Sequence, residues 1–271
     1  MTGEDELPPY RAVLVVDTKE FGGHSDRGQA VLADAIPDVL ALAFERAGLA
    51  HVWRDALFPH GTGDGFGIGF DPRHLPAVVM RLFGQLQDVL AERHDRLPGG
   101  ARRVRLRMRA SLNVGPVLDP GPGTGSAAAI GGAVITTHRL LDAPEVRTLL
   151  TRSDPDQTFL AVALSQRVFE DVVLTEYAQL PPSVIVARRV DVKEYHGTVH
   201  LYVPCPSGDL LVHGFGDDAD EHGDVTPRST PANTVPSTTN LISGGDFGTA
   251  IQVGHLHGGL QSGPGGRSRK P

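Results

Sequence analysis

The chain has 271 residues, enough for one medium-sized domain and an appendage, because single hydrophobic cores stop growing at roughly 250 to 300 residues. Its net charge of -7 gives no electrostatic footprint for nucleic acid or an anionic membrane surface. A single cysteine, Cys205, excludes an internal disulfide framework. The N-terminus has no apolar leader, and no stretch approaches the roughly 18 apolar residues of a spanning helix, so we expect a cytoplasmic protein.

Hydrophobic periodicity and turn residues divide the chain before residue 204 into strands and helices. Strands are predicted at residues 12–17, 51–58, 66–70, 104–117, 158–163, 184–190 and 198–203, and helices at residues 29–47, 76–92, 134–141, 144–150 and 165–172. Pro37 predicts a kink or a break in the first helix. The order predicts an α+β fold, a ferredoxin-like antiparallel sheet: a βαββαβ core with helices on one face and an extra C-terminal αβαββ layer.

Two aspartates fall on turns beside buried strands. Asp17 ends the first strand, and Asp64 lies in the tip PHGTGDG, whose Asp-Gly pair is the strongest short hairpin signal in the chain. The first and third strands of a split βαβ sheet are neighbours, so the two carboxylates can converge. Two carboxylate oxygens together with substrate phosphates are the usual ligands of Mg²⁺. The alternative is that each aspartate only caps its own turn.

Two other groups of titratable side chains have simpler interpretations. Arginines recur at every second position from Arg103 to Arg109, with Arg102 beside them, and this spacing places them on one face of a strand. We interpret them as a solvated strand face rather than a polyphosphate patch. The histidines, among them His51 and His74, show no metal-ligand spacing, and we assign no zinc.

Residues 10–204 resemble the catalytic domain of class III nucleotide cyclases in the segments VVDTKEFGG, GTGDGFGIGF, RLRMRASLNVGPV and GGAVITTHRLLDAP, and in the closing strands. The resemblance implies that Asp17 and Asp64 bind Mg²⁺ or Mn²⁺. It also implies that Arg139 stabilises charge on the pentavalent phosphate of a nucleoside triphosphate. In that family the site forms in a homodimer, with the aspartates from one subunit and the arginine from the other.

The sequence departs from the family pattern at several nucleotide contacts. Ile135 stands at the position of the transition-state asparagine, and His60 stands where adenine-specific relatives place a lysine. Ala128 replaces a base-reading aspartate. The late phosphate-binding lysine falls at Tyr195, although Lys193 is close enough to substitute.

These departures leave two hypotheses open. Losing one oriented donor costs a few kcal/mol of transition-state stabilisation, so slow turnover is expected unless Asn113 or His138 replaces the asparagine. In the first hypothesis the protein is a phosphorus-oxygen lyase that cyclises a nucleotide other than ATP, including a pyrimidine, by attack of the 3'-hydroxyl on the α-phosphate. In the second it is an inactive pseudo-cyclase that serves as a nucleotide-binding or scaffold module.

The region after the domain has a different composition. Residues 205–239 are rich in Gly, Asp, Pro, Ser and Thr and predict a disordered linker, and flexible or disordered ends are expected at residues 1–9 and 262–271. Residues 240–261 alternate small, apolar and Gly residues with almost no charge, which favours cross-β pairing. The alternative is a low-complexity tail that never orders.

This segment resembles bacterial amyloid signalling motifs related to the RIP homotypic interaction motif. The residues that carry the resemblance are Gly245, Phe247, Ile251, Gln252, Val253, Gly254, His257 and Gly258. The resemblance implies a cytoplasmic effector in a bacterial immune-type (antiviral defence) pathway. Its partner would be a STAND-type NTPase sensor that carries a matching segment.

Overall fold

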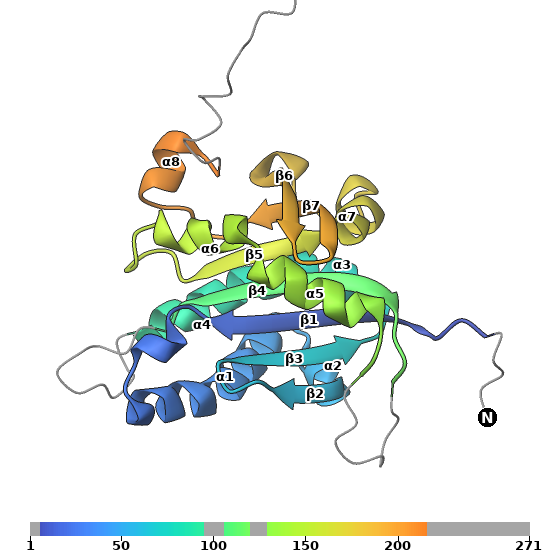
Figure 1. Cartoon of the computed structure of the whole chain (residues 1–271), viewed down its shortest axis with the longest axis horizontal. Helices are drawn as coiled ribbons and strands as arrows, with labels where there is room; N and C mark the ends of the chain where they lie inside the picture. Colours follow the sequence, from blue (N-terminus) through green and yellow to red (C-terminus); the bar gives the residue numbers. More distant parts are fainter. Residues whose placement is uncertain (1–5, 95–105, 120–128, 216–271) are drawn as a thin grey trace, which may run out of the picture. The chain divides into compact units, whose positions relative to one another are not determined.

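The computed structural model describes residues 6–94, 106–119 and 129–215 (Figure 1). These residues form a seven-stranded sheet in the order β2-β3-β1-β4-β5-β7-β6. The strands are β1 (Tyr10–Thr18), β2 (Leu57–Gly61), β3 (Gly65–Phe70), β4 (Met108–Pro116), β5 (Leu160–Ser165), β6 (Ile185–Val192) and β7 (Tyr195–Tyr202). The predicted signalling motif and most of the predicted linker lie outside the described residues.

The α+β prediction is confirmed, and the sheet is mixed rather than wholly antiparallel. Strand β1 pairs antiparallel with both β3 and β4, as the split βαβ core requires. Strand β4 pairs parallel with β5, and a parallel pair needs a long crossover connection. Helices α5 (Gly132–Asp142) and α6 (Pro144–Thr151) lie in that connection.

Helices cover both faces of the sheet, which explains why β1 is apolar at successive positions. Its Leu14 and Val16 pack into the core formed with helices α1 (Asp26–Arg46) and α4 (Phe83–His94). Its Val13 and Val15 pack on the opposite face, in a cluster with Ala133 and Leu141. These two residues belong to α5, the helix that lies over β1 in Figure 1. Buried on both faces, β1 is a rigid support for the aspartate near its end.

Three predicted elements differ from the structure. Residues 51–58 are not one strand, because Leu49 and Val52 face the core at helical spacing and α2 (Ala50–Arg54) precedes β2. Pro37 does not break α1, whose buried Ile36 and neighbours pack against the sheet and outweigh one lost hydrogen bond. The predicted linker begins with a short helix, α8 (Asp209–His213), anchored by buried Leu210.

The predicted helix over residues 76–92 is built from several helical turns. A 3-10 turn, η2 (Pro72–His74), leads into α3 (Leu75–Ala77), the π turn η3 (Val78–Leu82) and then α4. The short helix after β5 likewise combines α7 (Gln166–Val168) with the π turn η4 (Phe169–Leu174). The remaining 3-10 turns are η1 (Phe21–Gly23) and η5 (Pro182–Val184). Within the described ranges, no helix is long and apolar enough to cross a membrane.

Candidate functional site

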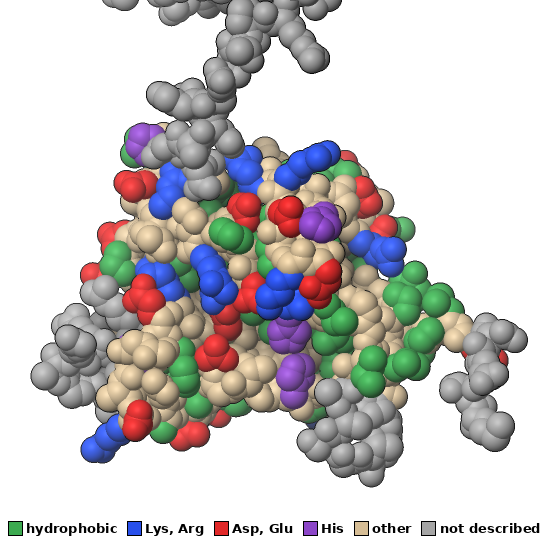
Figure 2. All heavy atoms as spheres, in the orientation of Figure 1, with side chains coloured by type: hydrophobic (Ala, Val, Ile, Leu, Met, Phe, Trp, Pro, Cys, Tyr) green, Lys and Arg blue, Asp and Glu red, His purple; other side chains and the backbone are tan. Residues whose placement is uncertain are grey.

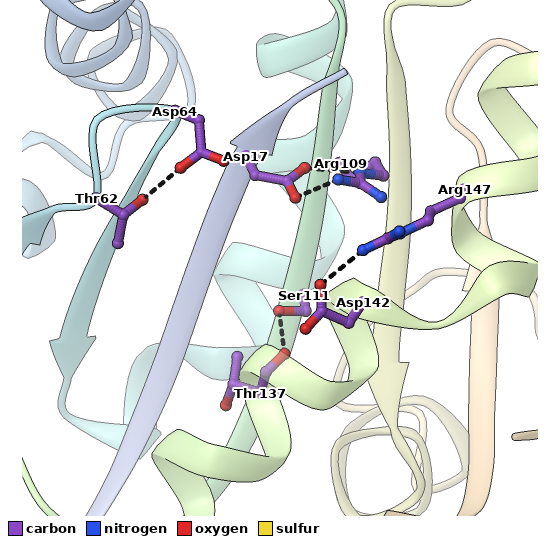
Figure 3. A network of polar contacts seen from close by, with 8 residues as sticks. All are labelled: Asp17, Thr62, Asp64, Arg109, Ser111, Thr137, Asp142 and Arg147. Atoms are coloured by element: carbon purple, nitrogen blue, oxygen red, sulfur yellow. Dashed lines mark hydrogen bonds and ion pairs between the residues drawn. The ribbon is translucent and has the colours of Figure 1, made fainter. Parts of the chain in front are cut away.

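The structure places Asp17 and Asp64 side by side at one end of the sheet (Figure 3). Asp17 lies opposite Gly65 in the β1–β3 pairing. The backbone amide of Thr18 donates to the carbonyl oxygen of Asp64 at 2.8 Å, which fixes the hairpin tip against β1. The two carboxylates, 47 positions apart in the sequence, are therefore brought together by strand pairing.

Glycine at position 65 makes this close approach possible. A Cβ atom at Gly65 would lie 2.2 Å from the carbonyl oxygen of Val16, a distance that real Cβ atoms essentially never show. Gly63 has φ +89°, in the left-handed region, and turns the tip. The Thr62 hydroxyl then donates to a carboxylate oxygen of Asp64 at 3.0 Å and orients that side chain.

Asp17 forms a bidentate ion pair with Arg109, the residue directly opposite it on β4. The Nε atom of Arg109 donates to Oδ1 of Asp17 at 2.7 Å, and Nη2 donates to Oδ2. The two side chains are only 12% and 13% exposed, for Arg109 and Asp17 in that order. Both carboxylate oxygens of Asp17 are thus held by a guanidinium group.

The predicted solvated arginine face is wrong for both described arginines of that run. Arg107 is buried and donates to the carbonyl oxygen of Thr158 at 2.8 Å and to the hydroxyl of Ser153 at 2.9 Å. Arg109 is turned into the site beside Asp17. The reason is that β4 is a central strand covered on both faces, so charges there need internal partners. Arg102, Arg103 and Arg105 lie outside the described residues.

Burial gives Asp17 an unusual proton affinity. Its pKa is raised to about 6 because burial disfavours the charged carboxylate more than the Arg109 guanidinium favours it. The negative charges of Asp64 and Asp142 act in the same direction. A further positive charge beside this carboxylate would lower its pKa again.

A pocket of about 650 Å³ opens beside the aspartates. Its walls come from the end of β1 and the following turn, the β2–β3 hairpin tip, β4 and α6. Its basic lining residues are Lys19, Arg109 and Arg147, and its acidic ones are Asp64 and Glu20, the latter in an ion pair with Lys19. Arg147 reaches the pocket from α6 while its Nη2 atom donates to Oδ1 of Asp142 at 2.8 Å (Figure 3). Each of the three cations is paired with an acidic side chain, so acidic and basic groups are interspersed here, as they are over the face of the domain drawn in Figure 2.

The donor set fits a hard divalent cation only in part. Asp64 is exposed, and carboxylate oxygens are the ligands that Mg²⁺ and Mn²⁺ prefer. Within the described part of the chain, no three His, Cys, Asp or Glu side chains are arranged to hold a metal by themselves. A divalent cation at Asp17 and Asp64 would therefore need phosphate oxygens and water as further ligands, and Arg109 would have to release the Asp17 carboxylate.

Arg139 and Lys193 are brought to a different place from the aspartates. Arg139 projects from α5 and forms an ion pair with Glu194, with Nη2 and Oε1 2.9 Å apart. Glu194 follows Lys193 in the β6–β7 turn, where Lys193 has φ +55°. The hydrogen bond from Arg139 lowers the pKa of Glu194. Within one chain, Arg139 points to this turn rather than into the pocket.

His60 and His138 approach each other across β2 and α5, with ring centroids 6.2 Å apart. The His60 ring packs over Gly67, where a Cβ atom would lie 2.4 Å from the ring. Its Nδ1 atom lies 3.1 Å from the carbonyl oxygen of Phe58, which can only accept, so Nδ1 is the donor. Burial, then the nearby His60, lowers the pKa of His138.

Asn113, one of the two candidates to replace the asparagine, and Tyr195, at the position of the family lysine, have structural tasks instead. Asn113 is buried and donates to the carbonyl oxygen of Ala133 at 3.0 Å, so it does not stand in for the missing asparagine. Tyr195 is half-buried over Gly197, with its hydroxyl 3.4 Å from the carbonyl oxygen of Thr198. Ile135 is 51% exposed on α5 and has no polar group to offer. Ala128 lies outside the described residues.

Sequence reasoning missed Arg109 and Arg147 as site residues. The spacing of the arginine run showed that Arg109 shares a strand face with its neighbours, but not that Asp17 lies opposite. Nothing in the sequence pointed to Arg147 as a pocket residue, except that it follows Asp142 by five positions and lies in the next predicted helix. Neither role could be predicted, because the pairing and packing of elements that are far apart in the sequence decide which side chains these two arginines contact.

Comparison with known proteins finds similarity in structure alone. No protein-family model matches the sequence, and no curated protein matches it. A bacterial light-regulated adenylyl cyclase superposes with a TM-score of 0.51 at 15% identity over 78% of this chain and 57% of that chain. A second structure of such an enzyme gives a TM-score of 0.50 at 14% identity over 74% and 93%.

An adenylate/guanylate cyclase/hydrolase from Silicibacter pomeroyi is also similar, with a TM-score of 0.46 at 20% identity over 72% of this chain and 97% of that chain. Identities this low bear on the fold and not on activity. The described domain therefore has a class III nucleotide cyclase-like fold, with Asp17 and Asp64 on neighbouring turns of its sheet.

Proposed function

We propose that this protein is a nucleotide cyclase that converts a nucleoside triphosphate other than ATP into a cyclic nucleotide. The 3'-hydroxyl attacks the α-phosphate, a new P–O bond forms, and pyrophosphate leaves. The observation that carries the proposal is the pair Asp17 and Asp64 beside a pocket lined by Lys19, Arg109 and Arg147. Acidic and basic groups together in one pocket suit metal-bound polyphosphate better than either ligand alone.

Each side chain has a role in this proposal. Asp64, exposed and oriented by Thr62, would hold Mg²⁺ or Mn²⁺ together with Asp17. A metal bound there would lower the pKa of the attacking hydroxyl and neutralise phosphate charge. Arg109 exchanges its partner, leaving the Asp17 carboxylate for a phosphate oxygen as the nucleotide enters. Lys19 and Arg147, which are paired with Glu20 and Asp142 in the free protein, likewise exchange these partners for the outer phosphates.

We propose further that a homodimer completes the site. In the single chain, Arg139 pairs with Glu194 and stays outside the pocket. In this proposal, the Arg139 of a second copy supplies the charge to the α-phosphate. His60 and His138, which face each other on the same domain, are the candidates for contacting the base. Lys193, on the same turn as Glu194, supplies a further phosphate contact.

The signalling role rests on the sequence of residues 240–261, outside the described part of the chain. We propose that this segment templates cross-β assembly with a matching segment of a STAND-type NTPase sensor and thereby concentrates the cyclase-like domains. Tethering raises the effective concentration of the subunits and favours their pairing. In this scheme the product acts as a messenger in a bacterial immune-type pathway.

A second candidate function is favoured by a specific observation. Ile135 is exposed at the position where the resemblance expects an asparagine, and Asn113 is committed to Ala133. In this candidate function, the domain without that donor binds nucleotide and has no significant turnover. In this alternative the domain is a nucleotide-responsive scaffold, and the C-terminal segment alone transmits the signal.

One experiment separates the two candidates. The purified full chain is incubated with each of the four ribonucleoside triphosphates and Mn²⁺, and the products are identified by mass spectrometry. The proposal expects one cyclic nucleotide and its loss in Asp64→Ala, whereas Asp171→Ala, an exposed aspartate in η4, leaves the yield unchanged. A product that persists in Asp64→Ala disproves the site assignment. Nucleotide binding without product supports the scaffold.

A further inference from the structure

A second pocket, of about 300 Å³, lies at the opposite end of β1 from Asp17. It is formed where the start of β1 meets α2, the start of β2 and the β3–η2 junction (Figure 1). Six residues of strand, at about 3.3 Å each, place Arg11 roughly 20 Å from Asp17. The two pockets are therefore separate sites on the same sheet.

Arg11 places an unpaired hydrogen-bond donor in this pocket. Its Nε atom is buried and has no hydrogen-bond partner among the described residues. Among the described residues its guanidinium donates one hydrogen bond, a long one from Nη1 to the carbonyl oxygen of Tyr10 at 3.4 Å. A buried donor of a charged group that stays unpaired costs stability, so its presence indicates a partner that the protein itself does not supply.

Two histidines face each other in the same pocket. The rings of His51, on α2, and His74, in η2, are edge to face with centroids 5.1 Å apart. The Nε atom of Arg73 donates to Nε2 of His74 at 3.3 Å, which makes Nε2 the acceptor and leaves the ring proton on Nδ1. The pKa of His74 is lowered by burial and then by the charges of Arg73 and His51. These surroundings disfavour an added positive charge and favour a negative one.

The acidic residues of the pocket already have partners. Asp71 accepts from the backbone amide of Arg73 at 3.0 Å and lies 3.4 Å from its Nε atom. Asp55 pairs with Arg54 at 3.6 Å. The group left without a partner is thus a donor, which selects an anion over a cation. The other wall is apolar, formed by Leu57 and Phe70.

We propose that this pocket is a second ligand site, one that binds a phosphate group carried on a small apolar body. The phosphate oxygens accept from Nε of Arg11 and from the ring N–H groups of His51 and His74. The apolar body lies against Leu57 and Phe70. Because the site lies at the other end of β1, the inference does not rest on cyclase activity, and neither nucleotide nor metal enters its test.

Histidine ring resonances of the full-length protein report on the site directly. Inorganic phosphate and phenyl phosphate are titrated in separate experiments while ¹H–¹³C spectra of the rings are recorded, with His51→Gln and His74→Gln used for assignment. The proposal expects saturable shifts of His51 and His74, with phenyl phosphate bound several-fold more tightly than inorganic phosphate. The rings of His60 and His138 identify any binding near the first site.

Arginine variants decide whether Arg11 is the anchor. Arg11→Gln is expected to weaken phenyl phosphate binding about tenfold or more, since one charge-assisted contact is lost. Arg11→Lys restores part of the affinity, and Arg189→Gln, an exposed arginine on the edge strand β6, changes nothing. The proposal is overturned if His51 and His74 show no saturable shift up to about 10 mM ligand, a concentration at which a site with a millimolar Kd is nearly saturated. Equal affinity in Arg11→Gln overturns it as well. Should Arg11→Gln fail to fold, His51→Gln replaces it. Phenyl phosphate binding, followed on the remaining ring of His74, is then expected to weaken by the same factor.

Discussion

Arg109 lies directly opposite Asp17 in the β1–β4 pairing and binds both of its carboxylate oxygens, although the two residues are 92 positions apart. The same contact keeps a buried carboxylate charged and occupies the oxygens that a metal ion would need. A cation that holds the carboxylate in the free protein and moves to a phosphate in the complex would couple metal binding to nucleotide binding.

A double-mutant cycle measures this pair. Arg109→Gln leaves the Asp17 carboxylate without its buried partner, and we expect a loss of about 1 to 3 kcal/mol in the free energy of unfolding at pH 7. Asp17→Asn together with Arg109→Gln removes both charges and should recover a large part of that loss. Urea denaturation of the four proteins gives the coupling energy. A coupling near zero would mean that the ion pair is absent in solution.

Arg147 is expected to matter for phosphate binding and little for folding. Its ion pair with Asp142 is half-exposed, so its loss changes stability by less than about 1 kcal/mol. We expect Arg147→Gln to weaken binding of pyrophosphate with Mg²⁺ roughly five- to tenfold, because about one charge-assisted contact is lost; calorimetry measures this change. Arg189→Gln is the matched control. If both variants bind pyrophosphate as the unmodified protein does, Arg147 has no part in the site.

Two glycine substitutions should have opposite effects. Gly65→Ala forces a Cβ atom against the carbonyl oxygen of Val16, and we expect a loss of at least about 2 kcal/mol together with displacement of Asp64. Gly84→Ala, in α4 with open space around it, should stabilise the domain by about 0.5 to 1 kcal/mol. Thermal and urea unfolding compare the two. A neutral Gly65→Ala would show that the hairpin is held less closely to β1.

The burial of His200 predicts that the domain loses stability at mildly acidic pH. It is buried, stacks on Phe169 with centroids 3.8 Å apart, and has Nε2 2.7 Å from Oε1 of Gln166. Burial lowers its pKa, while Glu170 opposes that change. The unfolded chain therefore binds a proton at higher pH than the folded one. The stability contributed by the neutral, buried His200 is complete above the ordinary pKa of about 6.5 and is lost as pH falls.

The comparison variant is His200→Gln, which keeps a polar side chain but does not titrate. The free energy of unfolding of the unmodified protein, relative to this variant, should decrease between pH 7.5 and pH 5. The exposed His213, on α8, provides the control, since His213→Gln should leave that pH dependence unchanged. A difference that is flat with pH would show that His200 binds its proton equally well in both states.

The C-terminal segment makes a separate prediction. A peptide of residues 240–261 should form thioflavin-positive fibrils with cross-β diffraction spacings of about 4.7 and 10 Å. Gln252→Asp should weaken assembly, because stacked copies would bring like charges together, while Gln261→Asp at the edge of the segment should have a smaller effect. A peptide that stays monomeric at high concentration would contradict the signalling role.

Local sequence was sufficient to predict the two aspartate-bearing turns of the candidate site. The continuous apolar run that ends in Asp17 and the Asp-Gly turn at Asp64 are signals contained within a few residues, and each predicted its element. Where a nearby apolar contact decides between helix and strand, as at Val52, the local pattern was not enough. Packing against the core then selected the helix.

The sequence by itself determined the α+β order of elements and the two aspartate-bearing turns, because strand alternation and turn chemistry act between near neighbours. Only the tertiary structure decided that Arg109 binds Asp17, that Arg147 reaches the same pocket and that Arg139 turns to Glu194. An alternating pattern tells which face of a strand a side chain occupies. The register between strands far apart in the chain, and the helix that packs on them, decide which partner that side chain meets there.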